Sequence, residues 1–143
     1  MKIGDLALQA GCTAETVRFY EKAGLLPVAD RSANNYRSYG QRHLERLRFV
    51  RNCRALDMTH EEIHQLLALM EAPGSDCGGV NDLLDAHIRH VDVRITELTQ
   101  LKVQLDALRQ RCQQEQGVDA CGILQGLAEM ETVARPERHT HLG

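Results

Sequence analysis

The sequence predicts a mainly α-helical protein in which a head of short helices is followed by one long helix. Short apolar stripes with helical spacing, interrupted by Gly and Pro, fill the first half of the chain. Residues 80–112 contain neither Pro nor Gly and carry an apolar side chain or a cysteine at every seventh position. Aromatic residues make up 3% of the chain and Trp is absent, so we do not expect a large globular core.

The composition excludes some classes of protein and points to a polyanionic partner. No run of 18 apolar residues is present, so no membrane span is predicted. The polar start of the chain does not resemble a secretory signal, and we expect a cytoplasmic protein with reduced thiols. Residues 1–60 carry 10 Lys and Arg against 6 Asp and Glu, whereas residues 61–143 carry 7 against 14. A basic head favours a polyanion; random variation of surface charge is the alternative.

The head begins with the pattern of two short helices joined by a tight turn. Residues 3–9 have helical spacing, and Gly11 opens a turn. Thr13 is placed to cap a second helix, which should run to about Ala23 and be ended by Gly24. Two short helices with this Gly-containing turn are typical of a helix-turn-helix.

A small β-hairpin is predicted next, over residues 30–40. Asn34 and Asn35 tolerate the backbone angles of a tight turn, and Tyr36 and Tyr39 follow as residues that favour β-structure. Such a hairpin beside a helix-turn-helix forms a wing, so the head is predicted to be a winged helix-turn-helix.

Two connector helices complete a DNA-binding domain that we place at residues 1–71. Helical spacing returns over residues 41–54 and again over about 59–70. Thr59, followed three residues later by Glu62, is the signature of a capping box at the start of the second of these helices. The sequence Ala-Pro-Gly-Ser then ends the head.

A long helix is predicted over residues 79–112, with the heptad positions Leu84, Val91, Leu98, Leu105 and Cys112. Such a stripe is typical of a coiled coil, and at 1.5 Å per residue the helix is roughly 50 Å long. A chain this small cannot bury the stripe by itself. We therefore predict a homodimer formed by this helix, the alternative being that the helix packs back on its own head.

The rear of the chain is predicted to contain a loop, a short helix and a tail. Residues 112–131 form a polar loop closed by Cys121 and a last amphipathic helix. Residues 132–143 are polar, contain His139 and His141, and are predicted to be a flexible tail.

The head offers a set of residues suited to double-stranded DNA. The second helix would lie in the major groove, where Arg18 can bind guanine through two hydrogen bonds. Tyr20 and the wing residues are suited to phosphate contacts, which position the protein on DNA and do not specify the base sequence. The predicted DNA-binding residues are Thr13, Arg18, Tyr20, Arg31, Asn35, Tyr36, Arg37 and Arg54. Each of them, taken alone, is equally compatible with a solvated surface.

The motifs of the head resemble the MerR family of transcription regulators. They are Ile-Gly-Asp-Leu-Ala from residue 3, Thr-Val-Arg-Phe-Tyr-Glu-Lys from residue 16 followed by Gly-Leu-Leu-Pro, and Asn-Tyr-Arg-x-Tyr from residue 35. The resemblance implies a winged helix-turn-helix head, a helical connector and a long antiparallel coiled-coil dimerisation helix. It also implies an inverted-repeat operator between promoter elements that are spaced too far apart. Effector binding then twists this DNA so that RNA polymerase can use it.

Three of the five cysteines form a candidate metal site in such a dimer. Cys77 precedes the long helix, and Cys112 and Cys121 follow it, so one chain cannot bring all three together. In an antiparallel dimer, Cys77 of one chain meets Cys112 and Cys121 of the other. Three thiolates suit Pb(II), Cd(II), Hg(II) or Zn(II) and not Mg or Ca. A disulfide or inert thiols are the alternative, and Cys12 and Cys53 are interpreted as buried or incidental residues.

The sequences around these cysteines resemble the lead and cadmium regulators of the metal-sensing branch of the family. The copper(I) sensors lack a cysteine at the position of Cys77, so the resemblance implies a divalent ion, with Pb(II) or Cd(II) favoured over Zn(II) and Hg(II). His87, His90, His139 and His141 are possible ligands of a secondary metal site. The alternative for His87 and His90 is a surface or interface position.

The predicted function is that of a metal-responsive regulator, not an enzyme, that activates heavy-metal resistance genes by distorting promoter DNA. The alternative is a cytosolic metal-storage protein or metallochaperone without promoter control. Such a protein would not need the Arg18 helix or the wing.

Overall fold

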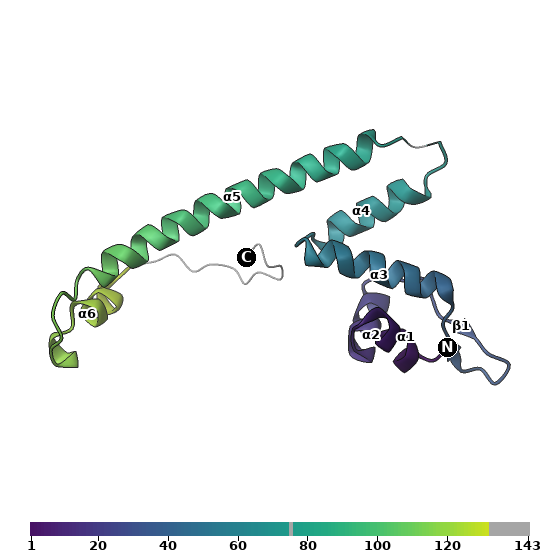
Figure 1. Ribbon diagram of the computed structural model, residues 1–143, viewed down its shortest axis with the longest axis horizontal. Coiled ribbons are helices and arrows are strands. Elements are labelled where there is room, and N and C mark those ends of the chain that lie inside the picture. Colours follow the sequence, from purple (N-terminus) through teal and green to yellow (C-terminus); the bar gives the residue numbers. More distant parts are fainter. Residues whose placement is uncertain (75, 132–143) are drawn as a thin grey trace. The chain divides into compact units, whose positions relative to one another are not determined.

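The computed structural model describes residues 1–74 and 76–131, which form six α-helices, one 3₁₀ helix and one two-stranded sheet (Figure 1). The chain divides into two compact units, Met1–Leu84 and Asp85–Gly143, which meet within the long helix. Among the described residues, no helix combines the length and the apolar character that a membrane crossing requires. The mainly helical fold predicted from the sequence is confirmed.

Helices α1 (Ile3–Ala10) and α2 (Ala14–Lys22) form the predicted helix-turn-helix. Gly11 has a left-handed backbone with φ 71°, which is why a glycine ends α1. The hydroxyl of Thr13 accepts a hydrogen bond from the Thr16 amide at 3.1 Å and so caps α2. An N-cap of this kind stabilises a helix by about 1 kcal/mol.

The predicted wing is a hairpin of two short antiparallel strands, β1 (Asp30–Arg31) and β2 (Arg37–Ser38). Arg31 pairs with Arg37 in the register of the sheet. Asn35 has φ 63° and provides the left-handed turn residue, as the Asn-Asn sequence predicted. The wing is therefore confirmed, although its strands are only two residues long.

Helices α3 (Gln41–Ala55) and α4 (His60–Glu71) follow the wing. The capping box at the start of α4 is complete: Glu62 N–H donates to the Thr59 hydroxyl at 3.1 Å, and Thr59 N–H donates to the Glu62 carboxylate at 2.9 Å. The Arg46 guanidinium and the Glu71 carboxylate form an ion pair at 2.6 Å between α3 and α4. Both predicted connector helices are thus confirmed.

The core of the head lies between α1, α2, α3 and α4. Its most deeply buried apolar side chains are Leu6, Val17, Leu25, Leu47, Val50 and Ile63. Truncating one such leucine to alanine costs about 2–5 kcal/mol, because the cavity does not fully collapse. This core holds the helices of the head together.

Helix α5 spans Gly78–Arg109, and its 32 residues make it about 48 Å long. The prediction that the helix reaches Cys112 is wrong. Beyond Arg109 the backbone turns more tightly, because the amides of Arg111 and Cys112 bond to carbonyls three residues back instead of four. The Arg109 guanidinium donates to the Cys112 carbonyl at 2.7 Å and holds this turn.

The chain then passes through a 3₁₀ turn, Val118–Ala120, into α6 (Gly122–Glu129). The last helix was predicted, but the 3₁₀ turn lies in the segment predicted to be an irregular loop. In Figure 1, α6 lies beside the C-terminal end of α5. His139 and His141 of the predicted tail lie outside the described residues.

Candidate functional site

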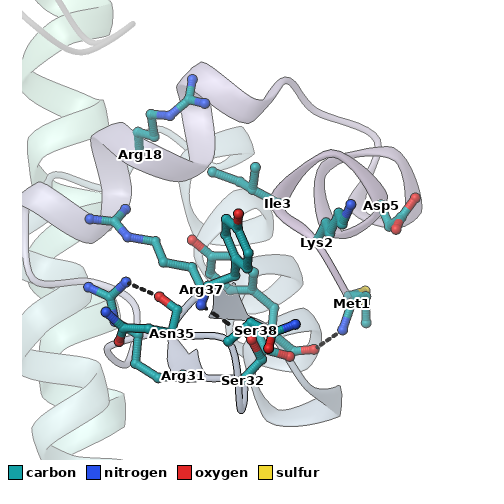
Figure 2. Close-up of a pocket in the computed structure, with 13 residues that line it drawn as sticks. Met1, Lys2, Ile3, Asp5, Arg18, Arg31, Ser32, Asn35, Arg37 and Ser38 are labelled. Atoms are coloured by element: carbon teal, nitrogen blue, oxygen red, sulfur yellow. Dashed lines mark hydrogen bonds between the residues drawn. The ribbon is translucent and has the colours of Figure 1, made fainter.

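A groove of about 1050 Å³ runs between the helix-turn-helix and the wing of the head. Figure 2 shows Arg18 on α2, and Arg31, Asn35 and Arg37 on the wing, lining this groove. Tyr36 also lines it. The structure therefore brings together five of the eight residues that the sequence predicted for DNA binding. Arg18, Arg31 and Arg37 also line the neighbouring groove, of about 610 Å³, so one basic surface joins helix and wing.

Glu21 connects α2 to the wing. Its carboxylate accepts hydrogen bonds from the Arg37 guanidinium at 3.2 Å and from the Tyr39 hydroxyl at 2.5 Å. Burial, followed by the hydrogen bond and charge of Glu21, raises the pKa of Tyr39 above its ordinary value, so the phenol keeps its proton and donates. Glu21 was not predicted from the sequence, because its two partners lie 16 and 18 residues away along the chain.

Internal hydrogen bonds fix the shape of the wing. The Arg31 guanidinium donates to the Asn35 carbonyl at 3.2 Å across the turn, and the Ser32 hydroxyl accepts from the Tyr36 amide at 3.2 Å. The side chain of Tyr36 stays exposed. Its exposed hydroxyl and the guanidinium groups are donors of the kind that bind phosphate oxygens.

The other three residues predicted for DNA binding have structural contacts of their own. Thr13 caps α2. Tyr20 is 8% exposed and packs in the core against Phe19 and His60, so little of its side chain faces solvent. Its role in DNA binding stays a prediction. Arg54 is half-buried, and its guanidinium donates to the Met58 carbonyl at 2.5 Å in the turn between α3 and α4. The apolar spacing of α2 could have identified Tyr20 as a core residue, since Val17 three positions earlier is buried.

Cys112 and Cys121 lie together at the end of α5, although nine positions separate them in the chain. Cys121 is the N-cap residue of α6, and the backbone amides of Leu124 and Ile123 in the first turn of that helix favour the charged form of its thiol. The Leu124 amide makes the largest contribution to a lowered pKa, which desolvation opposes and a hydrogen bond with the Cys112 side chain supports. Both cysteines are half-buried. A lowered pKa favours the thiolate, the form that binds a soft metal.

Two glycines allow α6 to lie close to the end of α5. A methyl group on Gly122 would overlap the backbone carbonyl oxygen of Arg111, next to Cys112. A methyl group on Gly126, one turn later, would overlap the Arg111 guanidinium and meet the Leu108 side chain at 2.9 Å. Neither glycine has a positive φ, so the close approach explains their presence. The four-residue spacing of the two glycines could have indicated this close approach from the sequence.

The remaining three cysteines lie elsewhere. Cys77 is exposed and immediately precedes α5, so within one chain the helix separates it from Cys112 and Cys121. Burial raises the pKa of both the Cys12 and the Cys53 thiol, which keeps them in the neutral, unreactive form. Their interpretation as buried or incidental residues agrees with this environment.

The two histidines proposed for a secondary site are neighbours on α5. Their ring centroids are 6.4 Å apart, and the rings meet edge to face. His87 is 4% exposed, so it does not occupy the surface position considered as an alternative, whereas His90 is exposed.

Two family models, both of MerR proteins, match overlapping parts of the chain. Residues 1–69 match the family model described as MerR HTH family regulatory protein, and residues 44–108 match the model described as MerR, DNA binding. A ZntR homolog of Haemophilus influenzae, described as an HTH-type transcriptional regulator, is 46% identical over 111 residues. That match covers 78% of this chain and 82% of the relative.

Two solved structures resemble the chain. The transcription regulator PbrR691 from Ralstonia metallidurans CH34, in complex with lead(II), has a TM-score of 0.79 and 49% identity, covering 89% of this chain and 98% of that one. HiNmlR, a MerR family regulator lacking the sensor domain and bound to promoter DNA, has a TM-score of 0.50 and 25% identity. It covers 76% of this chain and 88% of its own length.

Proposed function

The chain belongs to the MerR family of DNA-binding transcription regulators, in its metal-sensing branch, and we propose that it activates heavy-metal resistance genes when a soft divalent ion binds. Family membership makes it a regulator and not an enzyme. The metal ligands, the operator and the metal itself are our proposal. The observation that carries the proposal is the close approach of α6 to the end of α5, where Gly122 lies against Arg111 and so brings Cys121 near Cys112.

The seam of α5 supports a homodimer. Leu98 and Leu105 lie one heptad apart and are 46% and 56% exposed in the single chain. Burying a leucine side chain contributes about 1.5–3 kcal/mol, so a seam of this length favours association. We propose an antiparallel pairing, which brings Cys77 of one chain to Cys112 and Cys121 of the other. Three thiolates then converge twice in each dimer.

The donor set fits a soft ion. Three sulfur ligands with net negative charge suit Pb(II), Cd(II), Hg(II) or Zn(II). We favour Pb(II) or Cd(II) because Cys77 is present and because the lead-bound regulator is 49% identical over 89% of this chain. Zn(II) and Hg(II) remain as alternatives that a metal panel distinguishes. His87 and His90 are proposed as ligands of a secondary site.

The basic groove of the head supports binding to double-stranded DNA. Arg18 would read a base in the major groove, and Arg31, Asn35, Tyr36 and Arg37 would hold phosphates on either side. A twofold dimer fits an inverted-repeat operator. A metal ion bound by Cys112, Cys121 and the partner's Cys77 would fix α6 to the dimer. Metal binding could then change the geometry of the two heads on the promoter DNA, which RNA polymerase uses.

A promoter-reporter assay with a metal panel tests the proposal. We expect induction by Pb(II) or Cd(II), and operator binding in a gel shift both with and without metal. Operator binding without any metal response would contradict the sensor role. Metal binding by a protein that does not shift its operator would instead favour a storage protein or metallochaperone.

Arg18→Ala is expected to weaken operator binding without changing dimerisation or metal uptake. Arg18 is exposed on α2 and lines both grooves, and a lost two-bond contact to a base costs about 1–3 kcal/mol, or roughly 5- to 150-fold in affinity. Titration of labelled operator at fixed salt measures the change. Unchanged affinity would remove Arg18 from the interface.

Gly122→Ala is expected to lower metal affinity by about 10- to 100-fold, the range typical of residues that support metal ligands. The added methyl group would push α6 away from the Arg111 carbonyl and separate Cys121 from Cys112. Gly117→Ala is the matched control, because its methyl group would meet only the flexible Asp119 carboxylate, at 2.5 Å. Competition with a chromophoric chelator measures both affinities, and equal losses would refute the positioning role of Gly122.

A further inference from the structure

The imidazole of His43 is completely buried at the base of the wing. It lies on the first turn of α3 and contacts the chain on both sides of the hairpin. Nδ1 lies 2.9 Å from the Gly40 amide nitrogen, just after β2, and Nε2 lies 3.1 Å from the Val28 carbonyl oxygen, just before β1. One side chain therefore joins the two ends of the wing.

The two backbone partners determine which nitrogen carries the proton. The Gly40 amide can only donate, so Nδ1 must accept and carries no hydrogen. The Val28 carbonyl can only accept, so Nε2 carries the hydrogen and donates. Both bonds form only in the neutral imidazole with its proton on Nε2. No aliphatic side chain can replace them, and without them two backbone groups near the core would lose their partners.

The same ring is connected to the recognition helix. Tyr39 packs edge to face on His43, with ring centroids 5.3 Å apart, and its hydroxyl donates to Glu21 of α2. Glu21 in turn holds Arg37 of the wing. The position of His43 thus affects both the base of the hairpin and the arginine that faces the groove.

We propose that His43 is a positioning residue for operator binding, which holds the wing at a fixed angle to α2 by joining Val28 to Gly40. This inference rests on the proposed DNA interface, in which Arg31 and Arg37 of the wing hold phosphates. His43 itself does not touch DNA. Its loss should free the wing and leave the recognition helix in place.

The salt dependence of operator binding separates this role from a general loss of stability. Each phosphate contact contributes about 0.9 to the slope of log affinity against log salt concentration. We expect His43→Leu to lower this slope by about 1–2, as wing contacts are lost. Arg31→Ala in the otherwise unchanged protein is the reference: if it leaves the slope unchanged, the proposed wing interface fails, and not the role of His43.

Two polar variants each retain one of the two hydrogen bonds of His43. The amide oxygen in His43→Asn can accept from the Gly40 amide, and the amide nitrogen in His43→Gln can donate to the Val28 carbonyl. Each variant should therefore restore part of the slope that His43→Leu loses. If His43→Leu does not fold, these two variants test the positioning role of His43 in its place. Hydrogen exchange should then show faster exchange of the Ser32 and Tyr36 amides in the Asn and Gln variants, while the amides of α4 stay protected.

His64→Leu is the matched control. Its imidazole also bonds to a backbone carbonyl, that of Ala23 at 2.9 Å, but outside the wing. Exchange at Ser32 and Tyr36 should be unchanged in this variant. A folded His43 variant with the original salt slope and the original wing exchange would overturn the inference, and so would an equal rise in exchange throughout the head.

Discussion

Replacing Cys112 or Cys121 with serine is expected to abolish metal-dependent induction. Gly122 lies against Arg111, which places Cys121 near Cys112, and a serine hydroxyl stays protonated near neutral pH. A soft ion would then lose one of three strong ligands, and the induced reporter signal should fall to the level without metal. The same substitution at Cys77 should have the same effect, because the partner's site would lack its third thiolate.

Operator binding without metal should be unchanged in all three variants, since none of these cysteines lies in the head groove. Cys12→Ser is the matched control, because it makes the same atomic change at a thiol that burial keeps neutral. Gel shifts and reporter assays on the four variants measure both properties. Full induction in the Cys112 or Cys121 variant would exclude that cysteine from the sensor site.

Leu98→Glu is expected to dissociate the dimer and, with it, operator binding. In an antiparallel pair the substitution occurs twice, so it removes about 3–6 kcal/mol of apolar burial before the cost of the buried charges is added. The dimer dissociation constant should therefore rise by more than about 100-fold. A monomer contacts one half of an inverted repeat and loses the affinity of the second half.

Val103→Glu is the control for the seam. Val103 is 63% exposed on α5, and it lies five residues after Leu98 and two before Leu105, which places it off the stripe. Sedimentation at micromolar concentration should find this variant dimeric, and the unchanged protein dimeric with or without metal. A monomeric mass for the unchanged, metal-free protein would contradict the coiled-coil interpretation.

The parts of the fold that depend on neighbouring residues could be predicted from the sequence. Thr59 and Glu62 predicted the start of α4, because a capping box involves only four consecutive residues. Asn35 predicted the turn of the wing, because asparagine tolerates the positive φ that such a turn requires. The five residues that line the groove could be predicted because they belong to the helix-turn-helix and the wing, which were themselves predicted.

Features that depend on contacts between distant residues could not be predicted in this way. The heptad spacing predicted that the long helix extends to Cys112. In the structure α5 ends at Arg109, and the turn that follows is the one against which Gly122 packs, at Arg111. His43 carries a polar side chain in the core because the Val28 carbonyl, 15 residues away, meets the ring opposite the neighbouring Gly40 amide. Neither contact leaves a periodic pattern.

The cross-chain cysteine site is the central claim, and a mixed dimer tests it most directly. Chains carrying Cys77→Ser are paired with chains carrying Cys112→Ser, and the heterodimer is isolated. If the partner's Cys77 completes each site, one site keeps all three thiolates and the other loses two. Titration with Pb(II), followed by its thiolate absorption band, should then give one trithiolate site per heterodimer and none in either parent homodimer. A heterodimer without any trithiolate site would contradict the account.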